Sequence, residues 1–277
     1  MLHDAIREIV PRALAEDVGP GDVTTAATVA PEAKCRAEIV AKADGVIAGL
    51  EVARAVFEAV EPQVVFEAVV SDGTRVSAGT VVAKVAGSTR GVLTAERTAL
   101  NFLQRMSGIA TLTAQYVEAV KGTKARILDT RKTAPGLRLL DKYAVRAGGG
   151  KNHRIGLFDA VLIKDNHLRA AGGVGEAVRR AKAAHHLLEV EVEVQTIEEV
   201  DEAIAADAEV ILLDNMNLAE TRIAVARVAG RCHIEVSGGV NQETVRPLAE
   251  TGVDYISVGK LTHSAPALDL SLEIADD

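Results

Sequence analysis

Basic side chains gather in the middle of the chain. Between Lys124 and Arg169 there are eleven Lys and Arg residues against four Asp and no Glu, although the whole chain has a formal net charge of -8. Within this region lie three polar clusters, ThrArgLysThr (130–133), AsnHisArg (152–154) and LysAspAsnHis (164–167). Because they interrupt short apolar runs instead of lining one helix, we interpret them as parts of an anion-binding site. Arginine suits bidentate binding of a carboxylate or a phosphate.

Acidic residues that could pair with these cations lie farther along the chain. Glu191 and Glu193 alternate along the run LeuGluValGluValGluVal (188–194), so they share one face of a strand, and Asp214 ends the next apolar run. A buried carboxylate needs a partner, which implies a cation nearby. Oxygen ligands without His or Cys companions suit Mg²⁺ shared with a phosphate. Glu193 and Asp214 are therefore candidate magnesium ligands.

The elements that must position these residues alternate from residue 125 onward. We predict strands at 125–128, 160–163, 188–194, 209–213, 233–236 and 254–258, and helices near 196–206, 218–229 and 242–251. Strand, helix and strand at this interval favour parallel pairing, and six or seven such strands favour a barrel. Active sites of α/β barrels lie at the carboxyl ends of the strands. The residues at or just after the carboxyl ends of the predicted strands are Arg131, Lys132, Lys164, Glu193, Asp214, Asn215, Ser237, Gly238, Gly239, Gly259 and Lys260.

The first part of the chain lacks this alternation. We predict helices at 1–18, 49–60, 94–104 and 110–120, a turn at 19–25, two strands within 34–48 and short strands separated by glycine turns at 69–85. The last of these segments resembles half of a lipoyl or biotinyl carrier domain. It lacks the exposed lysine that such a carrier modifies at a hairpin tip, so we interpret it as a structural β layer.

Composition narrows the function classes. The chain of 277 residues is 48% hydrophobic and has two cysteines, which favours a large core without a disulfide framework. Its acidity, with three Tyr, four Phe and no Trp, argues against nucleic acid as a partner. The first residues read as an amphipathic helix rather than a secretion signal, and no apolar run approaches the roughly 20 residues of a membrane span. We therefore expect a cytoplasmic protein.

Long motifs carry a family resemblance. GDVTT (21–25), TAERTALNFLQRMSGIAT (94–111), DTRKTAPGLRLLDKYAV (129–145), GGGKNHRIGLFDAVLIKDNH (148–167), EVEV (191–194), ILLDN (211–215), EVSGGV (235–240) and GVDYISVGKLTHS (252–264) together resemble the quinolinate phosphoribosyltransferases. The resemblance implies transfer of phosphoribose from phosphoribosyl pyrophosphate to quinolinate, giving nicotinate mononucleotide, pyrophosphate and CO₂ in NAD biosynthesis.

The resemblance also implies an architecture. It comprises an N-terminal α+β open-faced sandwich domain (1–108, joined by the tail 265–277) and an incomplete seven-stranded α/β barrel of the type II phosphoribosyltransferases (109–264). It implies a magnesium requirement and a dimer, or a hexamer, in which one subunit completes the active site of another.

Roles follow for individual residues through the matching motifs. Arg131, His153, Arg154 and Lys164 line the quinolinate pocket in this reading, and Arg97 reaches it from the partner subunit. The phosphoribosyl donor is held by Lys132, Glu193, Asp214, Ser237, Gly238, Gly239, Gly259 and Lys260. Thr130 and His263 complete the predicted substrate contacts. Lys132, Lys164, Glu193 and Asp214 are the predicted catalytic residues.

Two other functions stay open from the residues alone. A barrel aldolase would use Lys164 as a Schiff-base amine. A non-catalytic anion-binding or carrier protein is the second alternative, suggested by residues 69–85. The other phosphoribosyltransferase fold is disfavoured, because its donor loop needs paired acids followed by hydroxyls and glycine, whereas AsnMetAsnLeu follows Asp214.

Overall fold

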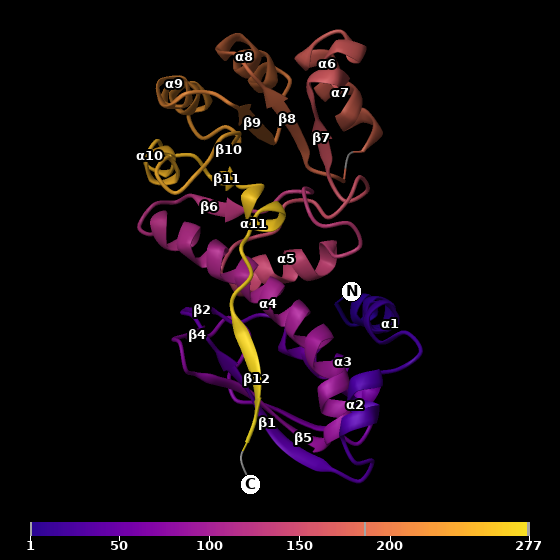
Figure 1. Ribbon diagram of the computed structural model, residues 1–277. Coiled ribbons are helices and arrows are strands. Elements are labelled where there is room, and N and C mark those ends of the chain that lie inside the picture. Colours follow the sequence, from indigo (N-terminus) through magenta and orange to yellow (C-terminus); the bar gives the residue numbers. More distant parts are fainter. Residues whose placement is uncertain (1, 186, 276–277) are drawn as a thin grey trace. The chain divides into compact units, whose positions relative to one another are not determined.

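The chain forms two compact units, which Figure 1 shows in a computed structural model that describes residues 2–185 and 187–275. The first unit comprises Met1–Ala114, Thr133–Gly149 and Leu261–Asp277, and the second comprises Gln115–Lys132 and Gly150–Lys260. The predicted tail 265–277 thus ends two residues beyond the described part of the chain. Among the described residues, no helix is long and apolar enough to cross a membrane.

The first unit is built on an antiparallel sheet with the strand order β12-β1-β5-β3. Its strands are β1 (Lys34–Ala41), β3 (Val65–Ala68), β5 (Val81–Ser88) and β12 (Leu270–Ile274). A two-stranded sheet joins β2 (Gly45–Val46) to β4 (Arg75–Val76). The helices of this unit are α1 (Leu2–Val18), α2 (Val23–Thr28), α3 (Leu50–Val60) and α5 (Arg138–Ala147), together with most of α4 (Thr89–Ala119). The two strands predicted around Asp44 exist, but each pairs with other strands.

Helix α4 corrects one prediction from the sequence. We predicted separate helices at 94–104 and 110–120, whereas α4 is one helix of 31 residues. Gly108 does not interrupt it, because a single glycine weakens a helix without ending it. A Cβ atom at Gly108 would lie 2.0 Å from the carbonyl oxygen of Pro266. The glycine therefore serves the close approach of the C-terminal segment to the helix.

The second unit contains a parallel sheet with the strand order β6-β11-β10-β9-β8-β7. Its strands are β6 (Arg126–Leu128), β7 (Val161–Ile163), β8 (Val190–Val194), β9 (Val210–Asp214), β10 (His233–Ser237) and β11 (Tyr255–Ser257). Its helices include α6 (Asp165–Ala171), α7 (Val174–Ala184), α8 (Ile197–Ala205), α9 (Leu218–Val228) and α10 (Val245–Ala249). All six predicted strands and the helices between β8 and β11 are confirmed. Figure 1 shows the helices around the outside of these strands.

The resemblance implied a seventh strand, and the sheet differs from this expectation at its edge beyond β6. Within the described residues the sheet has six strands, and beside β6 a single parallel bridge joins Leu128 to Lys151. The chain does not continue as a strand because the Asp129 carboxylate accepts hydrogen bonds from the Asn152 side chain (2.6 Å) and the His153 backbone N–H (2.9 Å). Side-chain contacts thus replace ladder hydrogen bonds just where AsnHisArg (152–154) begins.

Three helices between β6 and β8 were not predicted: α5, α6 and α7. Their sequences are rich in polar residues. Helix α11 (Lys260–His263) begins at the boundary between the units. The sheet itself is buried on both faces, as the unbroken burial of Val190 to Val194 shows. One face packs on apolar side chains, and the other carries Glu191, Glu193 and Glu235.

Candidate active site

A cavity of about 710 Å³ lies at the carboxyl ends of the parallel strands. Its volume is typical of small-molecule sites, which span roughly 300–1,000 Å³. All its lining residues belong to the second unit. They are Thr130, Arg131, Lys132, His153, Arg154, Leu162, Lys164, Glu193, Leu212, Asp214, Asn215, Glu235, Ser237, Gly238, Gly239, Ser257 and Gly259.

Two guanidinium groups meet on one side of this cavity. Burial and the neighbouring positive charge of Arg131 both lower the pKa of Arg154. Arg154 also donates a hydrogen bond of 3.5 Å from Nη1 to the carbonyl oxygen of Ala160. Like charges held together in a partly buried cavity favour an anionic ligand, because a carboxylate offsets their mutual repulsion. This side of the cavity can therefore bind an anion with more than one negative group.

Lys164 and Glu193 form an ion pair across the cavity wall. Lys164 directly follows β7 and is exposed, while Glu193 lies on β8 and is 9% exposed. The Lys164 Nζ atom donates to Oε2 of Glu193. The backbone N–H of Lys164 donates to Nδ1 of His167, which caps helix α6. The buried carboxylate that the sequence predicted to need a cation thus has one, and His167 has a local structural role.

The turn after β10 provides a second anion-binding element. Gly238 and Gly239 have φ angles of 91° and 63°, which favour glycine. A Cβ atom at Gly238 would lie 2.1 Å from Oδ1 of Asn215. Asn215 itself has a φ of 55° and donates its backbone N–H to the Ser237 carbonyl oxygen at 3.0 Å. The glycines thus let the chain turn tightly at the cavity wall, and a glycine turn of this kind is typical of phosphate sites.

Asp214 ends β9 beside this turn. Its carboxylate accepts two long hydrogen bonds of 3.4 Å, one from Ser237 Oγ and one from Gln195 Nε2. These contacts hold the carboxylate loosely, so its oxygens can still bind a cation. Together with Glu193 it offers oxygen ligands at one wall of the cavity. The pair fits a magnesium ion only if substrate phosphates and water supply the other ligands, since Mg²⁺ prefers six oxygens.

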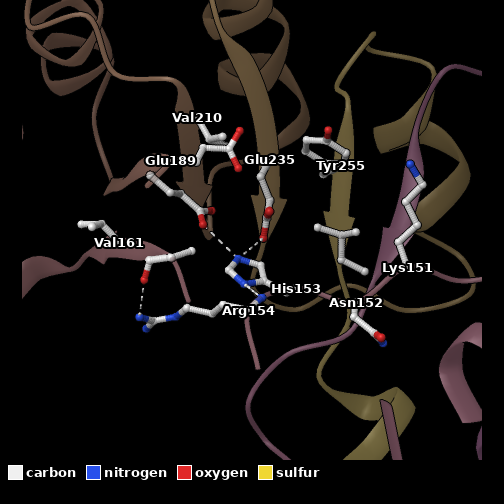
Figure 2. Close-up of a pocket in the computed structure, with 12 residues that line it drawn as sticks. Lys151, Asn152, His153, Arg154, Val161, Glu189, Val210, Glu235 and Tyr255 are labelled. Atoms are coloured by element: carbon white, nitrogen blue, oxygen red, sulfur yellow. Dashed lines mark hydrogen bonds and ion pairs between the residues drawn. The ribbon is translucent and has the colours of Figure 1, made fainter. Parts of the chain in front are cut away.

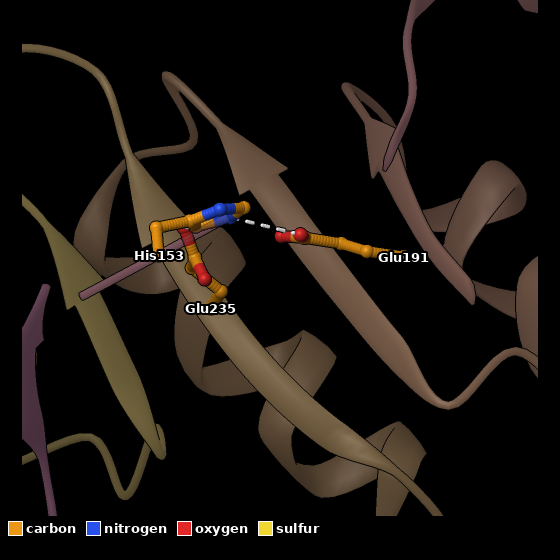
Figure 3. A group of neighbouring side chains, drawn as sticks. All are labelled: His153, Glu191 and Glu235. Atoms are coloured by element: carbon orange, nitrogen blue, oxygen red, sulfur yellow. Dashed lines mark ion pairs between the residues drawn. The ribbon is translucent and has the colours of Figure 1, made fainter. Parts of the chain in front are cut away.

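At the wall of the cavity lies a cluster of His153, Glu191 and Glu235, in which both glutamates are buried (Figure 3). His153 Nε2 is 2.9 Å from Glu191 Oε2 and 3.7 Å from Glu235 Oε1. Ser257 Oγ donates to Glu235 Oε1 at 2.5 Å. Burial first and then the negative charge of Glu191 raise the pKa of Glu235. One potential ligand atom from each residue lies within 4.8 Å of the others, a spacing that also suits a metal ion.

The same cluster borders a second, smaller cavity of about 200 Å³ (Figure 2). Its lining comes from the amino ends of the strands, with Val161, Glu189, Val210 and Tyr255 among its residues. His153, Arg154 and Glu235 line both cavities. His153 therefore lies between the larger cavity at the carboxyl ends of the strands and the smaller cavity at their amino ends.

The structure brings together most of the residues predicted from sequence. The larger cavity includes Thr130, Arg131, Lys132, His153, Arg154, Lys164, Glu193, Asp214, Ser237, Gly238, Gly239 and Gly259. Lys260 is exposed and is not among the described lining residues. Arg97 and His263 are exposed residues of the first unit.

Glu235 is the functional candidate that sequence reasoning missed. The segment HisIleGluValSer (233–237) alternates, so Glu235 shares a face with Ser237. Ser237 was already a predicted contact, and the alternation therefore contained the signal. Glu235 lies between two apolar residues in the sequence, and its burial at 2% exposure appears only in the folded chain.

Comparison with known proteins identifies the family. Models of the N-terminal and C-terminal domains of quinolinate phosphoribosyl transferase match residues 22–107 and 109–273. The nicotinate-nucleotide pyrophosphorylase (carboxylating) of Mycobacterium leprae is 48% identical over 279 residues, which cover 98% of each chain. A mitochondrial quinolinate phosphoribosyltransferase of Nicotiana tabacum is 47% identical over 292 residues, covering 97% of this chain and 82% of the relative.

Solved structures agree. The nicotinate-nucleotide pyrophosphorylase of Francisella tularensis matches with a TM-score of 0.95 and 42% identity, covering 98% of this chain and 96% of its own. NadC of Streptococcus pyogenes matches with a TM-score of 0.94 and 44% identity over 98% of this chain. From these full-length matches, the chain belongs to the quinolinate phosphoribosyl transferase family.

Proposed function

We propose that the protein transfers phosphoribose from phosphoribosyl pyrophosphate to the ring nitrogen of quinolinate. The ring nitrogen attacks the anomeric carbon, and pyrophosphate leaves. Loss of the carboxylate next to the nitrogen as CO₂, with a proton taking its place, then gives nicotinate mononucleotide for NAD biosynthesis. The observation that carries this proposal is one cavity that joins a guanidinium pair, a glycine turn and two carboxylates, in a chain of this family.

The guanidinium pair supports quinolinate as the acceptor. Quinolinate has two carboxylates, and Arg131 and Arg154 lie close enough to act on each other's charge. In our proposal these two arginines bind the ring carboxylates and orient the nitrogen. Lys164 completes this side, with its Nζ held by Glu193. Binding in a fixed orientation lowers the entropic cost of the bimolecular reaction.

Other residues of the cavity lining support the phosphoribosyl donor. In our proposal Lys132 and the backbone N–H groups of Gly238, Gly239 and Gly259 bind its phosphates. Glu193 faces the sugar and stabilises the positive charge that develops on the ribose as pyrophosphate leaves. Lys132 stabilises the departing anion. These assignments rest on the position of each residue at the cavity wall.

We further propose a magnesium ion shared between the protein and the donor phosphates. Glu193 and Asp214 are the residues that would hold it, since their oxygens line the cavity. When bound, the ion would offset the negative charge of the pyrophosphate group. Chelation with EDTA should abolish product formation, and added Mg²⁺ should restore it.

The finer architecture is also part of the proposal. We propose that the six-stranded sheet curves into an incomplete barrel, with the Leu128–Lys151 bridge at the place of a further strand. We also propose a dimer in which Arg97 of one subunit reaches the quinolinate side of the other subunit's cavity. Its exposure in the first unit makes Arg97 accessible for such a role.

The decisive experiment follows nicotinate mononucleotide, pyrophosphate and CO₂ with phosphoribosyl pyrophosphate and Mg²⁺. Quinolinate should be consumed and nicotinate should not, because nicotinate lacks the second carboxylate that the arginine pair binds. Equal rates with both acceptors would contradict the acceptor assignment. Borohydride trapping on a carbonyl substrate tests the aldolase alternative, and we expect no adduct at Lys164, because Glu193 holds its Nζ.

A further inference from the structure

Both ring nitrogens of His153 have protein partners. Nδ1 accepts a hydrogen bond from the backbone N–H of Arg154 at 2.7 Å. Nε2 faces the Glu191 carboxylate at 2.9 Å. The backbone N–H of His153 donates to Asp129 at 2.9 Å. The ring is thus fixed between the segment that carries Arg154 and the inner face of the sheet, as Figures 2 and 3 show.

These contacts specify where the proton sits on the ring. A backbone N–H can only donate, so Nδ1 must present its lone pair to Arg154. A carboxylate can only accept, so Nε2 must carry the hydrogen that points at Glu191. His153 is therefore held as the neutral Nε2–H tautomer. In this form the ring connects the Arg154 backbone to Glu191 through two directed hydrogen bonds.

Glu235 can act as a hydrogen-bond partner for the buried carboxyl group of Glu191. Oε1 of Glu191 is buried and has no donor among the described residues, and Glu191 as a whole is 7% exposed. Glu235 is 2% exposed, and its Oε1 accepts from Ser257. Burial beside Glu191 raises the pKa of Glu235, which favours its protonated form. In this form Glu235 can donate to Oε1 of Glu191, the buried oxygen that has no other donor among the described residues.

We propose that Glu191 and Glu235 are positioning residues that orient Arg154 toward quinolinate through the ring of His153. The chain of hydrogen bonds runs from Ser257 to Glu235, Glu191, His153 and the backbone N–H of Arg154. It anchors the Arg154 backbone, and Arg154 lines the larger cavity together with Arg131. This inference rests on the proposed function for the identity of the ligand only.

Paired substitutions test the two glutamates. Glu191→Leu removes the acceptor for His153, and Glu235→Leu removes the donor to Glu191. Each should raise the KM for quinolinate roughly 10- to 100-fold, the range that a misplacement of about 1 Å can cost. The KM for phosphoribosyl pyrophosphate should change less than about twofold, because no donor contact depends on the chain of hydrogen bonds.

The conservative variants should rescue binding. The amide oxygen of Glu191→Gln still accepts from His153, and Glu235→Gln mimics a protonated carboxyl that donates and accepts. Both should keep the quinolinate KM within about threefold of the parent. Glu189→Leu is the matched control, since Glu189 lines the smaller cavity and is not one of the residues in this chain of hydrogen bonds, and it should leave both KM values unchanged. Equal losses in the Gln and Leu variants, or equal changes in both KM values, would overturn the proposal.

A spectroscopic measurement tests the tautomer without catalysis. Protein labelled with ¹⁵N in its histidine rings should show His153, assigned through His153→Gln, with a bare Nδ1 and a protonated Nε2 at neutral pH. Glu191→Leu should alter that signal. A protonated Nδ1 in the parent, or a stoichiometric metal ion retained after purification with added Zn²⁺ or Mn²⁺, would overturn the inference. Quinolinate binding by calorimetry separates this outcome from failure of the proposed transferase reaction.

Discussion

His153 and its neighbours show how much one side chain's role depends on its partners. The sequence placed this residue among the quinolinate contacts, and it does line the larger cavity. Its two ring nitrogens, however, face Arg154 and Glu191. We therefore expect anion binding in the cavity to depend mainly on the guanidinium groups of Arg131 and Arg154, which carry a permanent charge.

Removal of either guanidinium should weaken quinolinate binding selectively. Arg131→Ala and Arg154→Ala each remove charge-assisted hydrogen bonds that contribute about 2–3 kcal/mol, which corresponds to a roughly 30- to 150-fold rise in the quinolinate dissociation constant. Calorimetric titration of each variant measures this loss. Arg169→Ala is the control, because this exposed arginine does not line the cavity among the described residues. Near-normal quinolinate affinity in both variants would refute the assignment.

Asp214 should act on the donor instead. Asp214→Asn keeps the shape and one of the two oxygens that accept from Ser237 and Gln195 but removes the negative charge. We expect the Mg²⁺ concentration for half-maximal rate to rise by roughly tenfold, since loss of one charged ligand weakens a shared magnesium site. The KM for quinolinate should stay constant. A rise in the quinolinate KM alone would place Asp214 on the acceptor side.

At the scale of elements, close approaches decide where glycine is needed. Gly108 lies within α4, where the backbone of Pro266 leaves no room for a Cβ atom. Gly175 lies in the first turn of α7, where a Cβ atom would meet nothing within 4 Å. Both glycines lie in helices. Helix propensity alone would therefore predict that replacement by alanine raises the free energy of unfolding at both positions.

The two substitutions should therefore have opposite effects. Gly108→Ala should lower the free energy of unfolding by about 1–3 kcal/mol, because overpacking exceeds the gain of up to about 1 kcal/mol in helix propensity. Gly175→Ala should be neutral or stabilise the protein by up to about 1 kcal/mol. Urea unfolding followed by circular dichroism measures both changes. A Gly108→Ala variant as stable as Gly175→Ala would show that the contact with Pro266 is absent in solution.

At the scale of the whole molecule, the proposed dimer predicts that two inactive variants restore activity when their chains form mixed dimers. If Arg97 serves the cavity of its partner, Arg97→Ala and Arg131→Ala chains each lack activity alone. Unfolding and refolding them together should form mixed dimers in which one site has both arginines. In an equal mixture the rate should recover to roughly a quarter of the parent rate.

A mixture of two variants of the same cavity provides the control for this recovery. Two variants of one cavity, Arg131→Ala and Arg154→Ala, should fail to complement if both residues come from the same chain. Sedimentation velocity should show a dimer or a larger assembly in every mixture. Recovery in the Arg131→Ala and Arg154→Ala mixture, or none with Arg97→Ala, would contradict the shared site.

The sequence determined the parallel sheet and most of the cavity lining. Short apolar runs of β-branched residues, each followed by a polar residue, repeat often enough to locate all six strands. Because parallel strands align their carboxyl ends, Arg131, Lys164, Glu193 and Asp214 had to meet at one edge. Local pattern and chain direction together were sufficient for this part of the site.

Tertiary structure alone decided the contacts between residues far apart in the chain. The bridge beside β6, the unbroken helix α4 and the cluster of Glu235 with Glu191 and His153 depend on packing that local patterns do not encode. Glu235 and Glu191 lie 44 positions apart in the sequence, and only the pairing of β8, β9 and β10 brings them to one face. Burial then raises the pKa of Glu235, because the cost of a charge depends on its surroundings rather than on the residue type.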